Sequence, residues 1–234
     1  MTTPYLLLWF EGPLQSWGMN AKFNRRTTLD FPTRSAVLGL LCAALGAGGE
    51  QKELLARFAR LTQTTVAYAR KDKKGNAAPA LQLCDFHMVG SGYDDKHPWQ
   101  TLHIPKTSEK KAAVGGGTKL TYRYYIQDAA FAVALAIPAE LQQDLEEALV
   151  MPCWDMSLGR KCCVPTEFVF QGIYASMDAA LACAEELAQK KQRLELFRVL
   201  DGAHEGEQRI LPDVPLQFGP SKLYGERLVT VIAP

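Results

Sequence analysis

The sequence predicts an α+β fold of the modified ferredoxin-like or RRM class, and two observations predict it. Apolar runs and amphipathic stretches follow one another as strand, helix pair, strand, insertion, strand, helix and strand, which is the order of two joined βαβ units. The chain of 234 residues is 47% hydrophobic, so it can fill a core. A net charge of +1 excludes binding to polyanions through overall charge, so such a site needs local clusters of basic residues.

Each predicted element has its own local signal. Continuous apolar runs or β-branched alternation predict strands at residues 5–10, 62–70, 80–90, 120–138 and 167–175. The long run 120–138 is expected to break near Gln127 and Asp128. Apolar side chains at helical spacing predict helices at residues 34–45, 51–61 and 139–150. The tail adds a helix and two strands, at residues 176–192, 194–200 and 226–234. Residues rich in Gly, Pro, Asn and Thr predict loops at 12–33 and 151–166.

Residues 71–121 differ from the rest of the chain. After a strand-like stretch, their second half is rich in lysine, contains three consecutive glycines and has little apolar content. Such a segment cannot pack a core, and it is too long for an ordinary connection. We therefore expect an insertion that protrudes as a hairpin with a mobile tip.

The helix after Thr33 opens with Arg34 and then stays apolar as far as Gly46. The positive end of the helix dipole disfavours a cation in the first turn, so the position of Arg34 needs a cause. Two interpretations stay open. Arg34 is a solvated charge at the helix mouth, or a phosphate lies where its guanidinium and the free helix amides converge.

Basic residues gather in separate loop segments. Each segment alone is typical of a solvated surface, but on one RRM-like scaffold they could converge around a phosphodiester backbone. In the segment Gly159-Arg160-Lys161, the glycine permits a turn and close approach to a ligand. Arg160 adds a forked guanidinium, and Lys161 adds a point-like ammonium. The segments are Lys22-Arg25-Arg26-Arg34, the lysines of the insertion, and Gly159-Arg160-Lys161.

Two further patterns allow more than one interpretation. The rings of residues 122–126 (YRYYI) could stack on RNA bases, as the central strands of an RRM do, or simply pack. Tyr93, Trp99 and Ile104 place apolar side chains on the protruding insertion, which favours a protein partner there.

We expect no metal and no organic cofactor. The cysteines form no CxxC pair, and the Cys84–His87 spacing has no matching second pair. No export signal is apparent, and the longest apolar runs are too short to span a bilayer. These features indicate a cytoplasmic protein with reduced thiols.

Four sequence elements carry a resemblance to a known family. In order, YLLLWFEGPLQSWG, FPTRSAVLGLLCAALG, LCDFHMVG and SLGRKCCVP resemble the CasD family of subunits in the type I-E CRISPR surveillance complex, Cascade. The match runs from about residue 4 to residue 175. The GPxQxWG, FPTRSxxxGLL and LGRKxC motifs are together specific, whereas residues 176–234 carry no usable motif.

The resemblance implies a RAMP-superfamily fold. Residues 1–70 and 122–175 would form an RRM-like palm, residues 71–121 an inserted thumb, and residues 176–234 a C-terminal extension packed on the palm. It also implies a non-catalytic subunit that holds the 5′ handle of the CRISPR RNA in antiviral defence. Such a subunit caps the backbone filament, contacts the large PAM-reading subunit, and meets target DNA only indirectly. No membrane is involved.

The candidate contacts follow from the matched motifs and the basic loops. Contacts to RNA are expected from the Gln15–Gly18 loop, the helix mouth and the Gly159 loop, together with the basic residues between them. The RNA-binding candidates are Gln15, Trp17, Lys22, Arg25, Arg26, Arg34, Ser35, Gly159, Arg160 and Lys161. The thumb and partner candidates are Tyr93, Trp99, Ile104, Lys106, Lys110 and Lys111.

The alternative function is a metal-independent endoribonuclease that processes precursor CRISPR RNA, as a related type I-C subunit does. Such cleavage needs a general base, a general acid and a cation for the phosphate. His87, His97 or His103 with Tyr93 or Tyr122 and a lysine could be assigned these roles. Nothing in the sequence fixes their geometry, so we expect a binding protein and not an enzyme. An RNA-binding protein that acts alone is disfavoured by the apolar residues of the insertion.

Overall fold

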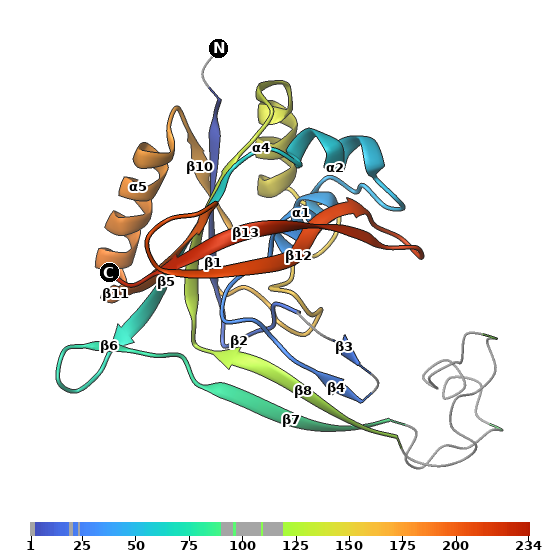
Figure 1. The fold of residues 1–234 in the computed structure, drawn as a ribbon, viewed down its shortest axis with the longest axis horizontal. Helices are drawn as coiled ribbons and strands as arrows, with labels where there is room; N and C mark the ends of the chain where they lie inside the picture. Colours follow the sequence, from blue (N-terminus) through green and yellow to red (C-terminus); the bar gives the residue numbers. More distant parts are fainter. Residues whose placement is uncertain (1–2, 19–20, 23, 90–95, 97–108, 110–118) are drawn as a thin grey trace.

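The structure is a computed structural model that describes residues 3–18, 21–22, 24–89, 96, 109 and 119–234. Within these residues it is a mixed α/β protein with two largely antiparallel sheets and four α-helices. The first sheet forms the body of the molecule, and the second extends from it (Figure 1).

The large sheet runs through both the predicted core and the C-terminal extension. All its strand pairs are antiparallel. Its order is β10 (Phe170–Tyr174), β1 (Tyr5–Glu11), β9 (Ala130–Ala136), β5 (Gln63–Lys71), β11 (Arg193–Asp201), β13 (Leu223–Ile232) and β12 (Glu207–Gln217), with β6 (Ala77–Ala78) on β5. The C-terminal residues therefore continue the sheet beyond β5, in addition to packing on it.

Helices cover both faces of this sheet. On one face, α1 (Arg34–Ala44), α2 (Lys52–Phe58), the 3₁₀ turn η1 (Ala139–Leu141) and α4 (Gln142–Val150) contribute to the main core. On the other face, alanines of α5 (Met177–Lys190) pack against Trp9 and Tyr68. Because each face is covered, β1 and β9 read as continuous apolar runs. The rings of Trp9 and Tyr68 are buried and are not available for base stacking.

The second sheet is built on β8 (Lys119–Gln127). One edge of β8 pairs with β7 (Gln82–Val89), and the resulting hairpin extends away from the body (Figure 1). The other edge pairs with β2 (Leu14–Gln15) and, in parallel, with β4 (Arg25–Arg26), which in turn pairs with β3 (Ala21–Lys22). Asp128 has a φ of 51°, and this left-handed residue separates β8 from β9, which confirms the predicted break.

Two parts of the sequence prediction need correction. Residues 12–33 were expected to be loop only, but they supply the short strands β2, β3 and β4. No strand was predicted between residues 201 and 225, where the structure has β12.

Several expectations fall outside the described residues. The tip of the insertion belongs to residues 90–95, 97–108 and 110–118, and with it Tyr93, Trp99, Ile104, Lys106, Lys110, Lys111, His97 and His103. In the part of the chain that the structure describes, no helix is long and apolar enough to cross a membrane.

Candidate functional site

The arginine that opens α1 is an internal ion-pair partner. The Arg34 side chain is 4% exposed, and its Nη2 donates to Asp201 Oδ2 at 2.7 Å and to the Leu61 carbonyl at 2.5 Å. Burial lowers the pKa of the Arg34 guanidinium, whereas the charge of Asp201 raises it. The expectation that Arg34 faces solvent or a bound phosphate is therefore wrong, because its charge is already used inside the protein.

Arg34 belongs to a cluster that ties α1 to the C-terminal strands. Arg227 of β13 donates to Asp201, and through Nε and Nη2 to Asp213 of β12 at 2.7 and 2.9 Å. Asp213 Oδ2 also accepts the Arg34 backbone amide at 2.7 Å. Burial acts against the charge on Arg227, but its hydrogen bonds with Asp213 outweigh that effect and raise its pKa. Asp213 thus accepts a hydrogen bond from an amide at the start of α1. The phosphate interpretation of the sequence had treated the amides of this helix start as free to bind a ligand.

Two candidates of the first loop also have structural roles. Gln15 is fully buried, and its Nε2 donates to the carbonyls of Phe10 and Ala129. Trp17 is 1% exposed and packs against Phe10 with ring centroids 5.4 Å apart. Neither side chain can contact RNA on the surface, so assigning RNA contacts to them is wrong. The side chain of Lys22 lies outside the described part.

Gly159 brings its loop against the backbone of the first loop. Its φ is +93°, and a Cβ at this position would lie 1.8 Å from the Ser16 carbonyl oxygen. A hydrogen bond of 3.1 Å from the Ser16 amide to the Leu158 carbonyl joins the same two segments. The close approach predicted for Gly159 therefore exists, but in this structure it is to Ser16.

Two arginines lie over tyrosines of β8. Arg160 lies 4.6 Å from the centroid of the buried Tyr125 ring, and its Nη2 donates to the Arg26 carbonyl at 2.9 Å. Arg25 lies 5.1 Å from the Tyr124 centroid and donates to its hydroxyl at 2.7 Å. Burial raises the pKa of Tyr125, so its ring stays neutral beneath the cation. The contacts with the tyrosines hold both arginine side chains in place. Of the two, Arg25 is exposed to solvent.

A pocket of about 460 Å³ lies where α1, the Gly159 loop and the C-terminal strands meet. From the predicted candidates it collects Ser35, Gly159 and Arg160, and from the first loop it takes Ser16 and Gly18. The other lining residues are Thr33, Ala36, Gly39, Leu40, Ala43, Asp155, Ser157, Phe218, Lys222 and Tyr224. Lys161 is exposed next to Arg160. Of the three basic segments predicted to converge, only the Gly159-Arg160-Lys161 segment contributes residues to this pocket, beside residues of the first loop and of α1.

Comparison with known proteins identifies the family of the chain. Residues 5–230 match the protein family described as CRISPR-associated protein (Cas_Cas5). The chain belongs to the Cas5 family. It is 30% identical over 177 residues to the CRISPR system Cascade subunit CasD of Escherichia coli (strain K12), across 74% of this chain and 73% of that protein.

Solved structures show the same relationship. One chain of a CRISPR RNA-guided surveillance complex matches with a TM-score of 0.71 and 27% identity, over 98% of this chain and 89% of that one. A crystal structure of a Cas protein matches with a TM-score of 0.58 and 25% identity, over 98% and 95% of the two chains. The predicted resemblance is confirmed: the chain is a CasD-type member of the Cas5 family.

A second and larger pocket of this Cas5 chain lacks the chemistry of a phosphate site. Its volume is about 610 Å³, and it lies at the base of the β7–β8 hairpin, lined mainly by apolar side chains of β5, the β6–β7 connection, the end of β8, and β11. Among its described lining residues the cation is Arg70, which lies 3.6 Å from Asp128. The smaller pocket, with Arg160 and Lys222, is therefore the better candidate for RNA.

The described histidines of this Cas5 chain, His87 and His204, lie in different parts of the fold. His87 lies on β7, where its Nδ1 is 3.5 Å from Asp85 Oδ2 and about half of its side chain is exposed. His204 Nε2 is bonded to the Asp201 carbonyl at 3.0 Å. The Tyr122 ring contacts Phe86 at 5.3 Å. His87 thus has the Asp85 carboxylate beside it, but Tyr122 pairs with Phe86, so the Tyr122 side chain lies on the opposite face of the hairpin from His87.

The sequence analysis missed the contribution of the C-terminal extension. Phe218, Lys222 and Tyr224 complete the pocket, although they are distant in sequence from its other residues. The available signal was the segment QFGPSKLYG, which has a turn composition with a lysine and aromatic rings.

Proposed function

We propose that this Cas5 protein is a non-catalytic subunit of a Cascade-type surveillance complex that holds the 5′ handle of the CRISPR RNA. The observation that carries the proposal is the pocket that brings Ser35, Arg160 and Lys222 together from three separate segments. Single-stranded RNA is typically bound by converging cations beside hydroxyls and rings that contact sugars and bases.

The cations around the pocket suit a bent RNA backbone. Arg160 is held in a stack on Tyr125, where its Nη2 donates to the Arg26 carbonyl and its buried Nη1 forms no hydrogen bond with a described residue. Arg25, Arg26 and Lys161 are exposed nearby along β4 and the Gly159 loop. Arg25 and Arg160 lie over consecutive tyrosines of β8 and thus flank its two faces near the edge that pairs with β4, so an RNA strand could pass from the pocket along this edge toward the β7–β8 hairpin.

The fold supports the finer architecture that the family resemblance implies. The strand order β10-β1-β9-β5 is the order expected of a ferredoxin-like palm at residues 1–70 and 122–175. The β7–β8 hairpin would be the base of a thumb at residues 71–121, and residues 176–234 would be the C-terminal extension. In the complex, the protein would cap the backbone filament and contact the large PAM-reading subunit, in the cytoplasm and in antiviral defence.

Binding without cleavage is tested with end-labelled repeat RNA in EDTA, which suppresses contaminating metal nucleases. The account expects retention of RNA that carries the handle and no change in its length. A single specific cut upstream of the handle, abolished by His87→Ala, would establish the ribonuclease instead. A scrambled RNA of equal length is the control for non-specific binding.

A further inference from the structure

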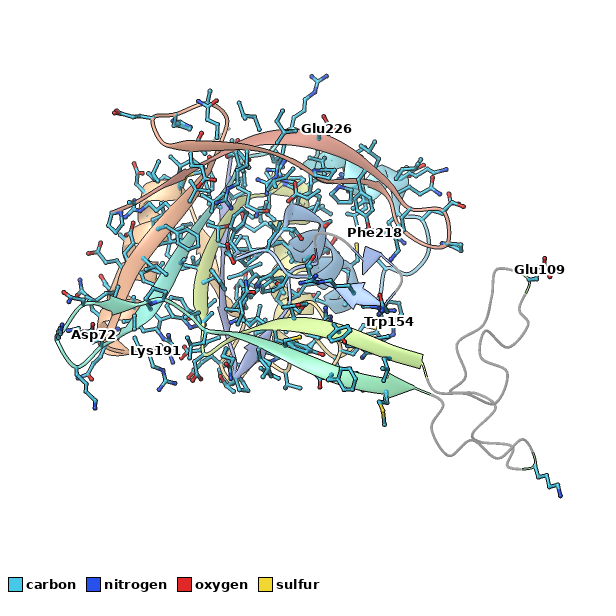
Figure 2. All side chains as sticks on the ribbon, turned by 60° about the horizontal axis from the view of Figure 1, so that its bottom comes forward. Asp72, Glu109, Trp154, Lys191, Phe218 and Glu226 are labelled. Atoms are coloured by element: carbon cyan, nitrogen blue, oxygen red, sulfur yellow. The ribbon has the colours of Figure 1, made fainter. Side chains whose placement is uncertain are left out.

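The β12–β13 turn is fixed beside the middle of α1 and the segment that follows this helix. The Phe218 amide donates to the Glu50 carbonyl at 2.9 Å, and the Phe218 ring lies over Gly39 of α1, where a Cβ would be 4.0 Å from Cζ. Figure 2 shows Phe218 on the same side of the molecule as Trp154, at the α1 end of the body. The glycine thus leaves space for the ring against the helix.

Buried ion pairs hold the strands on both sides of this turn. Asp213 of β12 and Arg227 of β13 bond each other, and Asp213 also bonds the first amide of α1. Moving the turn away from α1 would open these contacts and leave charges buried without partners, which is costly. The wall that the turn gives to the pocket is therefore preorganised.

Two groups at the turn are free to bind a ligand. Lys222 is exposed and forms no ion pair or side-chain hydrogen bond with a residue that the structure describes. Tyr224 is 42% exposed, and its hydroxyl likewise has no partner among the described residues. Both side chains line the pocket opposite the Gly159 loop.

The opposite wall carries an acceptor. Asp155 and Ser157 line the pocket next to Gly159. A carboxylate disfavours a site for phosphate alone, but it accepts hydrogen bonds from base amino and imino groups. A volume of about 460 Å³ is within the range of small-ligand sites, so base and sugar fit inside.

We infer that the β12–β13 turn holds a single unstacked nucleotide in this pocket, with Lys222 on its phosphate and Tyr224 against its base. The inference rests on the proposed function, because the nucleotide belongs to the bound RNA. Aromatic side chains and cations are the groups that bind unstacked bases of single-stranded RNA. The C-terminal extension, which carries no recognisable motif, is thereby a direct part of the RNA site.

The test uses the full chain and single-stranded RNAs that carry the repeat-derived 5′ end of the organism's CRISPR RNA. Each RNA has one base replaced by 2-aminopurine, whose fluorescence falls when it stacks on a ring. One position is expected to be quenched by the wild type. Tyr224→Ala should abolish this quenching and weaken binding about 5- to 150-fold, the equivalent of about 1–3 kcal/mol of stacking, whereas Tyr224→Phe should retain both.

The lysine has its own measurement and control. Lys222 lies in an exposed turn, so the Lys222→Ala protein should fold normally. The log–log slope of its RNA affinity against salt concentration should be smaller by about 0.7. Lys190→Ala, at the exposed end of α5 on the other face of the large sheet from α1, should leave the slope unchanged. If the wild type prefers handle RNA but neither Lys222→Ala nor Tyr224→Ala alters binding, the inference is overturned and the proposed function stands. If the wild type binds handle RNA no better than scrambled RNA, both the inference and the proposed function are contradicted.

Discussion

Arg34 Nη2 lies 2.7 Å from Asp201 Oδ2, and this contact joins the first turn of α1 to strand β11 inside the protein. An arginine at the positive end of a helix is unfavourable when considered alone. Here Asp201 and Asp213 supply the compensating charge from the C-terminal strands. The helix mouth and the C-terminal extension are therefore one structural unit, and the pocket lies between them.

Removing the Arg34 charge should destabilise the protein. We expect Arg34→Ala to lower the free energy of unfolding by about 3 kcal/mol, because it breaks a buried ion pair. Arg57→Ala removes a pair with Glu140 in which both partners are exposed, and should change the free energy of unfolding far less than Arg34→Ala does. Urea unfolding measures both. A folded Arg34→Ala protein whose salt slope for RNA binding is reduced would contradict the internal role and restore a phosphate contact.

Gly159 should tolerate no side chain. Gly159→Ala would force the loop away from Ser16, and we expect a loss of more than about 2 kcal/mol together with weaker RNA binding. Gly75→Ala is the matched control, because its φ of +85° is similar but no atom lies within 4 Å of the added Cβ. The control should cost only the conformational penalty, about 1 kcal/mol. Equal losses for the two variants would remove the Ser16 contact as the cause.

Arg160 should contribute to RNA binding through both its charge and its stacking on Tyr125. Arg160→Ala is expected to reduce the log–log salt slope of RNA binding by about 0.7. Arg160→Lys should keep the slope but lose affinity, since lysine presents a point charge and cannot stack as a planar fork. Titrations at several salt concentrations separate the two effects. A slope for Arg160→Ala equal to that of the wild type would exclude a phosphate contact at this residue.

Glu11 should make stability depend on pH. Burial opposes its ionisation, but hydrogen bonds from Trp9 and Arg193 outweigh this and lower its pKa. Its contribution is therefore complete above the unfolded pKa, near 4.5, and is lost as pH falls through the lower folded pKa. Glu11→Gln should be less stable than the wild type at pH 7, and the difference should shrink below about pH 4.5. A constant difference down to pH 3 would contradict this.

The elements that could be predicted are those whose signal is local. The runs YLLLWF and AFAVALA are apolar throughout because both faces of β1 and β9 are covered, and such runs are visible in sequence. Strand β12 was missed because Pro212 and Pro215 interrupt its pattern. It tolerates them as an edge strand whose register shifts between Leu211 and Val214 and again after Pro215.

The candidate site was predictable in part for the same reason. The Gly159-Arg160 loop carries its chemistry in consecutive residues, whereas the role of Arg34 depends on Asp201, a partner 167 positions away. Trp17 and Gln15 were named from a motif that proves to be structural, since both are buried. Lys222 and Tyr224 reach the pocket only through the pairing of β13 with β11 and β12, which no local pattern reveals.

Photocrosslinking in the assembled complex tests the central claim most directly. The complex is formed from this chain, the subunits encoded beside it and a guide RNA that carries 4-thiouridine at single positions. Peptides of this chain are then sequenced after irradiation. The account predicts crosslinks from repeat-derived nucleotides at the 5′ end of the guide to the peptide that contains Gly159 and Arg160. Crosslinks of this chain only to the spacer or the 3′ end of the RNA, in a complex that has assembled normally, would contradict it.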